Sequence, residues 1–346
     1  MSDLRIAIIG CGAVTAQAHL PVLARLDGVR PTLLVDRNLA RAESLAQQFG
    51  IARAAADYSA AFTEADAAVV ALPHYLHAPV SVALLQRGIH VLVEKPMALT
   101  AAECAAMIEA AEQGRAVLAV GLMRRFLRST RWARAAVQAG LLGPVRSFDV
   151  REGFIYNWPV ASDFFFRKET AGGGVLIDTG AHTLDSLLWW LGDVRSFEYF
   201  DDNCGGVEAD CRIQLEMTSG ATGIVELSRT RQLRNTAIIE GELATLEVSW
   251  ADVRLTPRPD ILTLSGIVKS VSRSGNDVQE YLEVMADSLT DWVDAIRTNR
   301  PPAVTGAEGM RSVALIENCY KQRQPLELAW NATGSERVPE LVGGLV

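Results

Sequence analysis

Lys95 is the first residue in the sequence whose type and position could carry out chemistry. It lies in Glu94-Lys95-Pro96, directly after the apolar run His90–Val93, and it is the only lysine in the first 167 residues. A lysine, unlike an arginine, changes its pKa readily when it is buried and presents a compact charge. If the apolar run is a strand of a parallel sheet, Lys95 lies at the carboxyl edge, where such sheets bind ligands. The alternative, a surface lysine in a turn that Pro96 stiffens, is the weaker interpretation because lysine is so scarce in this chain.

A carboxylate and an imidazole, Asp178 and His182, follow a run of three glycines at 172–174. A helix that begins near Val175 places the two side chains four residues apart on one face. That face continues with Asp185 and Trp189, and the opposite face carries Leu184, Leu187, Leu188 and Leu191. The leucine face indicates core packing, and a tryptophan on the same face as the histidine favours a lined cleft. A solvated carboxylate–imidazole pair is the alternative.

The segment Gly10-Cys11-Gly12-Ala13-Val14-Thr15 lies between an apolar run and a helical pattern. Its spacing is that of the dinucleotide-binding fingerprint, with a threonine in place of the third glycine. In that motif the first glycine permits a tight turn, the second lets the backbone approach a pyrophosphate, and the following helix N-terminus binds the phosphates. The spacing therefore predicts a dinucleotide cofactor held by Gly10, Cys11, Gly12, Ala13 and Val14.

Asp36 comes 24 positions after Gly12, at the end of the apolar run Thr32–Val35. In a dinucleotide-binding fold a carboxylate at this place accepts hydrogen bonds from the ribose hydroxyls and repels a 2′-phosphate. Asp36 therefore predicts NAD in preference to NADP, and the adjacent Arg37 softens that preference. The alternative is a solvated turn without a cofactor role.

The first third of the chain alternates strand-like and helix-like patterns. Short apolar runs bounded by turn residues indicate strands, and longer segments of helical period indicate helices. The predicted strands are 5–10, 32–35, 67–72, 90–93 and 117–120, and the predicted helices are 13–26 with a kink at Pro21, 40–49, 78–87 and 101–113. Strands separated by helices form βαβ units. We therefore predict an α/β domain over residues 1–121, with a doubly wound parallel sheet of the Rossmann type.

After Gly121 the strand-like segments follow one another with few helices between them. They cover 145–152, 195–201, 211–217, 221–228, 236–240 and 245–248, and helical patterns close the chain at about 284–298 and 307–320. Runs of strands indicate a mostly antiparallel sheet, so residues 122–346 are predicted to form an α+β domain. The junction of the two domains is the natural place for a ligand cleft.

Composition excludes several classes of protein. The chain has 346 residues, 49% of them apolar, and a net charge of −8 with no basic excess in either part, which argues against a nucleic-acid partner. The longest uncharged stretch, 67–86, contains two prolines and two histidines, and the N-terminus has no signal-peptide pattern, so neither a membrane span nor a membrane partner is expected. The five scattered cysteines favour a reducing cytoplasm, and no metal-ligand cluster is present.

Further candidate binding residues could each have a purely structural role instead. They are His74, His77, Arg124, Tyr156 and Trp158. The two histidines follow the run 67–72 and either contact the cofactor or cap a helix. The two aromatic residues either stack on a sugar ring or cover the core. Among the arginines between 124 and 134, only the first two are close enough to the predicted strand end at 120 to reach a cleft.

Together these residues resemble the Gfo/Idh/MocA family of glucose–fructose oxidoreductases, inositol dehydrogenases and rhizopine catabolism proteins. The resemblance covers most of the chain and rests on the ordered set Gly10-Cys11-Gly12-Ala13, Leu72-Pro73 with His77, Glu94-Lys95-Pro96, and Gly172–Gly174 followed by Asp178 and His182. The segment Val120–Phe126 also resembles the inositol-dehydrogenase branch, in which the first arginine of the pair, here Arg124, lies near the substrate. One departure concerns the nicotinamide side, because His74 stands where family members commonly have asparagine.

The resemblance implies that Lys95, Asp178 and His182 form the catalytic triad. It further implies cofactor contacts at Leu72, Pro73, His74, His77 and Glu94, and a large open sheet in the second domain that forms dimer or tetramer contacts. Together with the aromatic candidates Tyr156 and Trp158, the residues Arg124, Asp178 and His182 are the expected substrate-binding residues.

The expected function is NAD-dependent hydride transfer between nicotinamide and a secondary alcohol or ketone of a sugar, cyclitol or sugar derivative. His182 suits the role of base and Lys95 that of donor to the oxygen, although the two roles can be exchanged. Asp178 would orient His182 or hold a neighbouring hydroxyl. The alternatives are a nucleotide-sugar ketoreductase, a redox-neutral NAD-dependent glycoside-cleaving enzyme, and a non-catalytic NAD-sensing protein. The sequence leaves the substrate, the direction and the oligomeric state open.

Overall fold

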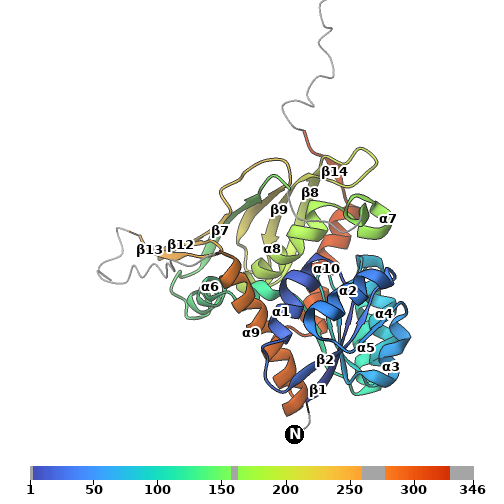
Figure 1. Ribbon diagram of the computed structural model, residues 1–346. Helices are drawn as coiled ribbons and strands as arrows, with labels where there is room; N and C mark the ends of the chain where they lie inside the picture. Colours follow the sequence, from blue (N-terminus) through green and yellow to red (C-terminus); the bar gives the residue numbers. More distant parts are fainter. Residues whose placement is uncertain (1–2, 157–162, 259–276, 328–346) are drawn as a thin grey trace, which may run out of the picture.

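The computed structural model describes residues 3–156, 163–258 and 277–327 of the chain. Its strands form two sheets, one of six strands and one of eight. In Figure 1 the smaller sheet and its helices lie at one end of the molecule and the larger sheet lies at the other. The helices α8 (Val175–Leu191) and α10 (Gly306–Lys321) run through the region between them. This arrangement confirms the predicted fold class.

The smaller sheet is parallel and doubly wound. Its strands are β1 (Leu4–Ile9), β2 (Val29–Val35), β3 (Arg53–Ala55), β4 (Ala67–Val70), β5 (His90–Val93) and β6 (Leu118–Val120). They lie in the order β3-β2-β1-β4-β5-β6, and every neighbouring pair is parallel. The strand order reverses between β1 and β4, and such a switch point is where open parallel sheets bind ligands. Strand β3 was not predicted, because its three residues include the exposed Arg53 and form no apolar run.

Four helices of the first third are α2 (Leu39–Phe49), α3 (Ala61–Glu64), α4 (His77–Leu85) and α5 (Ala101–Gly114). Right-handed crossovers from β1 toward β3 and from β4 toward β6 run in opposite directions, so the helices cover opposite faces of the sheet. The predicted helix 13–26 is shorter and irregular. It consists of a π-helical turn η1 (Thr15–His19) and the short α1 (Leu20–Leu23). Pro21 explains the wider turn, because its ring clashes with an α-helical carbonyl four residues earlier and it lacks an N–H.

The larger sheet is mixed but mostly antiparallel. Its strands are β7 (Val145–Gly153), β8 (Val194–Asp201), β9 (Asp210–Met217), β10 (Thr222–Ser228), β11 (Thr236–Gly241), β12 (Ala244–Val248), β13 (Val253–Pro257) and β14 (Gln324–Pro325). Their order is β13-β12-β11-β7-β10-β9-β8-β14. The pairs β7–β10 and β8–β14 are parallel, and the other pairs are antiparallel. All six strands predicted for this part are present, and β13 and β14 were not predicted.

One face of the larger sheet packs against helices. The helix α8 buries its leucine face there, with Leu184 and Leu187 almost inaccessible, and α6 (Arg128–Gln138) contributes Ala133 and Ala136 to the same core. A one-turn helix, α7 (Lys168–Ala171), precedes the glycine run. The position of α8 between the two sheets is therefore set by apolar packing on its leucine side, which turns Asp178 toward the smaller sheet.

The last part of the chain returns to the first sheet. The helix α9 (Asp277–Thr298) buries Met285, Leu289 and Trp292 in the core around β1–β6, and α10 packs against both α5 and α8. These helices join the two sheets into one packed unit, as Figure 1 shows. Within the described ranges, no helix is both long and apolar enough to cross a membrane. The five cysteines form no disulfide.

Candidate active site

The turn after β1 brings the glycine segment against the end of β4. Gly10 has a φ of 104°, and a Cβ at this position would lie 2.1 Å from the carbonyl oxygen of Ala71, so the close approach requires glycine. A Cβ on Gly12 would meet nothing within 4 Å. The Thr15 hydroxyl donates to the Gly10 carbonyl over 2.6 Å and holds the turn. The open space beside Gly12, at the start of a helical segment, fits the pyrophosphate of a dinucleotide.

Asp36 is fixed at the end of β2, next to this turn. Its Oδ2 accepts from the Cys11 backbone N–H over 3.0 Å, and its Oδ1 accepts from the Asn38 backbone N–H over 2.8 Å. The Arg41 guanidinium lies 3.7 Å from Oδ2, whereas Arg37 is exposed. Burial and the Asp36 charge raise the pKa of the Cys11 thiol to about 12, so this cysteine is neutral. The carboxylate is therefore held in one orientation at the place where a dinucleotide ribose lies in this fold.

Lys95 and Asp178 meet across the gap between the sheets. The Lys95 Nζ donates to Asp178 Oδ1 over 2.6 Å and to the Asp178 carbonyl over 3.1 Å. Arg229, which follows β10, donates from Nη2 to Asp178 Oδ2 over 2.8 Å. Burial alone would raise the pKa of Asp178, but the Lys95 and Arg229 charges hold it well below its usual range. Asp178 is therefore a permanent anion between two cations, and one N–H of the Lys95 ammonium has no acceptor among the described residues.

His182 lies one helical turn after Asp178. Burial, followed by the Arg124 and Lys95 charges, lowers the pKa of His182 well below its ordinary value, so the ring is neutral at pH 7. Its Nδ1 is enclosed and has no hydrogen-bond partner among the described residues. The expected orientation of His182 by Asp178 is not what the structure shows: no hydrogen bond joins the two side chains among the described residues, and the carboxylate binds Lys95 and Arg229 instead. Nε2 is the ring nitrogen that is left for a ligand.

A second ion pair lies beside His182. Arg124, in the turn after β6, binds Glu152 of β7 in a bidentate manner, with Nη1–Oε2 and Nη2–Oε1 distances of 2.7 and 2.5 Å. The Thr183 hydroxyl donates to Glu152 Oε2 over 2.7 Å. Burial alone would raise the pKa of Glu152, but Arg124 and Thr183 hold it below its usual range. Arg124 thus lies near the candidate catalytic residues, but its charge is already matched.

The glycine run positions the start of α8. Glu208, from the loop between β8 and β9, accepts from the Gly174 and Leu176 backbone N–H groups over 2.8 and 3.0 Å and from the Tyr320 hydroxyl over 2.7 Å. A Cβ on Gly174 would lie 1.8 Å from the Glu208 carbonyl oxygen, and a Cβ on Gly173 would lie 2.0 Å from the Tyr320 hydroxyl. A buried carboxylate therefore caps the helix that carries Asp178 and His182.

His74 and His77 connect loops at the edge of the smaller sheet. His77 Nδ1 lies 2.7 Å from the Pro96 carbonyl and its Nε2 lies 2.8 Å from the Leu72 carbonyl, so the ring joins the loops after β4 and β5. His74 Nδ1 lies 2.8 Å from the Ala171 carbonyl, and burial lowers the pKa of His74 to about 3. The His74 ring is therefore neutral. The two histidines hold the loop of Leu72 and Pro73 next to that of Lys95, and His74 also reaches the loop before α8.

Glu94 is held by a residue of the π-helical turn. Its Oε1 lies 2.8 Å from His19 Nε2, and its Oε2 accepts from the Lys95 backbone N–H over 3.2 Å. Burial alone would raise the pKa of Glu94, but the contact with His19 holds it below its usual range. The π-helical turn η1 and the Lys95 loop are therefore connected through one carboxylate.

The aromatic candidates are only partly described. Tyr156 lies beside the site, with the Arg229 guanidinium 4.9 Å from its ring centroid, and burial and the Asp178 charge raise the pKa of its hydroxyl to about 12. Trp158 falls outside the described residues. Tyr156 is therefore a neutral ring that packs against the cation that holds Asp178.

The rest of the polar face of α8 serves packing between the sheets. Asp185 is 2% exposed and binds Arg125, with Arg125 Nη2 2.6 Å from Asp185 Oδ1 and Nε 2.9 Å from Oδ2. Trp189 packs against the Arg125 and Arg134 guanidinium groups. The predicted cleft face therefore ends at His182, because the next turn of the helix is covered.

Sequence reasoning missed the residues that contribute to the site through long-range contacts. These are His19, Glu152, Thr183, Glu208 and Arg229. Two carried a weak signal, since Glu152 and Arg229 are charged residues at the ends of predicted strands. The described residues contain no cluster of His, Cys, Asp and Glu that could hold a metal ion.

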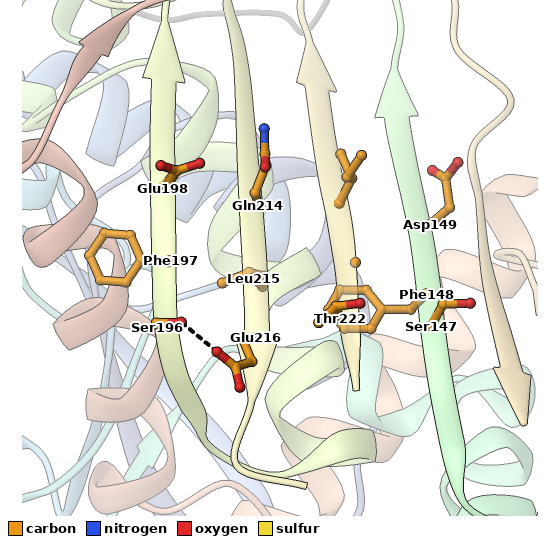
Figure 2. Close-up of a pocket in the computed structure, with 12 residues that line it drawn as sticks. Ser147, Phe148, Asp149, Ser196, Phe197, Glu198, Gln214, Leu215, Glu216 and Thr222 are labelled. Atoms are coloured by element: carbon orange, nitrogen blue, oxygen red, sulfur yellow. Dashed lines mark hydrogen bonds between the residues drawn. The ribbon is translucent and has the colours of Figure 1, made fainter. Parts of the chain in front are cut away.

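A shallow hollow lies on another part of the molecule. It has a volume of about 640 Å³ and is lined by residues of β7, β8, β9 and β10, which Figure 2 draws. Its lining includes Asp149, Glu198, Gln214 and Thr222, and Ser196 donates to Glu216 over 2.9 Å at its edge. None of the candidate catalytic residues lines it.

Comparison with known proteins gives matches over both sheets. A model of the Gfo/Idh/MocA oxidoreductase family, described as an NAD-binding Rossmann fold, matches residues 4–122, and the Gfo/Idh/MocA C-terminal domain matches residues 130–247. The chain is 32% identical to the D-glucoside 3-dehydrogenase of Escherichia coli over 55% of each chain. It is 30% identical to the NADP(+)-dependent D-xylose 1-dehydrogenase 2 of Haloferax volcanii, over 92% of this chain and 96% of the relative.

The fold has close counterparts among solved structures. An aldose–aldose oxidoreductase from Caulobacter crescentus, solved in complex with glycerol, superposes with a TM-score of 0.79 at 25% identity. The superposition covers 92% of this chain and 97% of that one.

Proposed function

The chain belongs to the Gfo/Idh/MocA family of oxidoreductases with an NAD-binding Rossmann fold, and we propose that it oxidises a secondary alcohol of a sugar or cyclitol with NAD, or reduces the corresponding ketone. The observation that carries this proposal is the 2.6 Å contact between Lys95 and Asp178, one helical turn from a neutral His182. The relatives named above support a carbohydrate substrate, since two of them are sugar dehydrogenases by name.

The cofactor would lie along the carboxyl edge of β1, β2, β4 and β5. Gly10, Cys11, Gly12, Ala13 and Val14 would hold the pyrophosphate, and Asp36 would accept from the ribose hydroxyls, with Arg37 beside them. Leu72, Pro73, His74, His77, Glu94 and Lys95 would line the nicotinamide side. Bound there, the nicotinamide ring supplies the hydride acceptor of the oxidation.

The proton chemistry follows from the charges around the substrate hydroxyl. As the C–H bond gives up its hydride, the hydroxyl proton passes to Nε2 of the neutral His182. The free N–H of the Lys95 ammonium donates to the same oxygen and stabilises its developing negative charge. Asp178 holds the ammonium in place and, with Arg229, positions it for this contact. In the reverse direction the acidic imidazolium of His182 returns the proton.

The two parts of the chain would have different roles in binding. We assign cofactor binding to residues 1–121, and substrate binding and oligomer contacts to residues 122–346, with Arg124, Tyr156, Trp158, Asp178 and His182 around the substrate. The open face of the larger sheet in Figure 2 is the proposed surface for a homodimer or homotetramer. A cytoplasmic location agrees with five free thiols.

The test is NADH formation at 340 nm with purified protein and NAD, and then NADP, against inositols, aldoses, uronates and nucleotide sugars. NADH formation from a neutral sugar or cyclitol is the expected result. Tight NAD binding without NADH formation from the alcohols, and without NADH consumption with the corresponding ketones, would overturn the proposal in favour of a redox-neutral enzyme or a sensor.

A further inference from the structure

Glu152 is the group beside the candidate site that the proton chemistry does not use. Its carboxylate is 16% exposed and the Arg124 side chain 21% exposed, so the pair is enclosed without being sealed in the core. Both Glu152 oxygens contact the Arg124 guanidinium, at 2.7 and 2.5 Å. An arginine fork of this kind is the preferred partner of a carboxylate on a ligand. Here the protein supplies that carboxylate itself.

The charges around the place proposed for the substrate hydroxyl, between Lys95 and His182, sum to zero. The cations are Lys95, Arg124 and Arg229, and the carboxylates are Glu94, Glu152 and Asp178. Arg124 pairs with Glu152, whereas Lys95 and Arg229 share Asp178. Glu94 adds the third negative charge beside Lys95, and His182 is neutral. A carboxylate or phosphate on the reacting ring would therefore find no net positive charge among these residues, and it would approach Glu152 and Asp178, two like charges.

The hydrogen-bonding capacity left at these carboxylates suits hydroxyl groups. A carboxylate accepts about four hydrogen bonds. Glu152 accepts three, two from Arg124 and one from Thr183, and Asp178 accepts one at each oxygen. Acceptor positions thus remain open at Glu152 Oε1 and at both oxygens of Asp178. A polyol can donate to them, whereas an ionised carboxylate cannot.

We propose that Glu152 is a specificity-determining residue: by occupying the Arg124 fork it makes the site select an uncharged polyhydroxy ring and reject the same ring bearing a carboxylate. The proposal deepens the function proposed above and rests on it. It concerns the ring at which oxidation occurs, and it leaves open whether a charged group lies elsewhere on a longer substrate.

The test uses pairs of sugars that differ only at C6, a hydroxymethyl group in one and a carboxylate in the other: D-glucose with D-glucuronate and D-galactose with D-galacturonate. Calorimetry measures their binding to the NADH-loaded protein, and NADH formation from the same sugars is measured separately. Wild-type protein is expected to bind the neutral member of a pair at least about 30-fold more tightly. Glu152→Gln frees the Arg124 fork of its charge partner, so this ratio should fall at least about tenfold, mainly through tighter binding of the uronate.

Glu226→Gln is the matched control. Glu226 of β10 is 20% exposed and pairs with Arg151, the neighbour of Glu152 on β7, so it lies on the opposite face of the sheet. Its substitution makes the same change in net charge and should leave the ratio within about twofold of wild type.

Three results would overturn the proposal. The first is equal binding of the neutral sugar and the uronate by the wild type. The second is an unchanged ratio of these two affinities in Glu152→Gln. The third is a fall of the same size in that ratio in Glu226→Gln. Selective binding of the neutral sugars without NADH formation from the alcohols or NADH consumption with the ketones would instead leave the role of Glu152 standing and remove the proposed function. If neither member of either pair binds, the proposal for Glu152 fails, and the wider panel of inositols and nucleotide sugars decides the proposed function.

Discussion

The Lys95 ammonium and the Asp178 carboxylate form a 2.6 Å ion pair although 83 residues separate them in the sequence. Lys95 follows β5 of the parallel sheet, and Asp178 lies in the first turn of α8, which packs on the other sheet. The pair therefore joins the edge that binds cofactors to the helix that carries His182. The two sheets must be correctly packed before the candidate site exists.

Substitution of either proton-handling residue should abolish most turnover. Lys95→Met and His182→Ala are each expected to lower kcat about 100-fold or more, the scale of a lost general acid or base. In His182→Ala, NADH binding, followed by fluorescence, should stay within a few-fold of wild type, because His182 is not among the residues proposed to line the cofactor. A variant that kept near-wild-type kcat would remove its residue from the proposed mechanism.

The pH profile distinguishes the two possible proton acceptors. Because burial and nearby cations lower the pKa of His182, kcat/KM for oxidation should be constant near pH 7 and fall only well below about pH 6.5, the ordinary pKa of a histidine, where the ring becomes protonated. Arg124→Leu removes one of those cations and leaves Glu152 unpaired, so the pKa of His182 should rise and the fall in rate should move to higher pH. An inflection above pH 7 in the wild type would assign the proton to Lys95 instead.

Unfolding must be measured over the same range. Burial lowers the pKa values of His74, His77 and His182, so these rings take up protons in the unfolded chain before the folded one. The free energy of unfolding should therefore decrease as pH falls below about 6.5, the pKa of an unfolded histidine. Rates should be compared only where urea titration shows the protein fully folded.

Asp36 should control the choice between NAD and NADP. Asp36→Asn removes the charge that repels a 2′-phosphate, so the ratio of kcat/KM for NADP to that for NAD should rise about tenfold. Arg37→Ala should move the ratio in the opposite direction, because Arg37 is exposed beside this carboxylate. Initial rates at 340 nm with both cofactors measure the effect. An unchanged ratio in Asp36→Asn would place the ribose elsewhere.

Removal of the Glu208 carboxylate should lower the free energy of unfolding more than removal of any one of the groups that donate to it. Glu208→Ala leaves the Gly174 and Leu176 N–H groups and the Tyr320 hydroxyl without their acceptor and is expected to cost about 3 kcal/mol of unfolding free energy. Tyr320→Phe removes one of these hydrogen bonds and should cost about 1 kcal/mol. Urea unfolding measures both variants. Equal losses would show that the carboxylate does not act as the helix cap.

Two arginine–aspartate pairs of similar geometry should differ in their effect on stability. Arg125→Met leaves Asp185, which is 2% exposed, as an unpaired buried acid, and should cost about 3–5 kcal/mol. Burial already raises the pKa of Asp185 despite the Arg125 charge. Arg5→Met breaks a pair whose side chains are about 40% exposed, and should cost less than about 1 kcal/mol. Similar losses in the two variants would contradict this difference in burial.

Much of the architecture could be predicted from local pattern. The alternation of apolar runs and helices predicts the parallel sheet, and the spacing of Gly10, Gly12 and Asp36 predicts the cofactor edge, because turns, strands and helix faces depend on neighbouring residues. The four-residue spacing of Asp178 and His182 likewise places them on one helix face. The irregular start of the first helix is also local in origin, since Pro21 dictates it.

What only the tertiary structure decided is how the charges pair. Sequence spacing favoured a contact between Asp178 and His182, whereas the folded chain gives Asp178 to Lys95 and Arg229 and leaves His182 a neutral ring. Glu152 reaches Arg124 because β7 lies beside β10 under α8, and strand order of this kind leaves no local trace in the sequence. Electrostatic partners depend on distance in space, and burial decides how strongly they act, so both emerge only when the two sheets pack together.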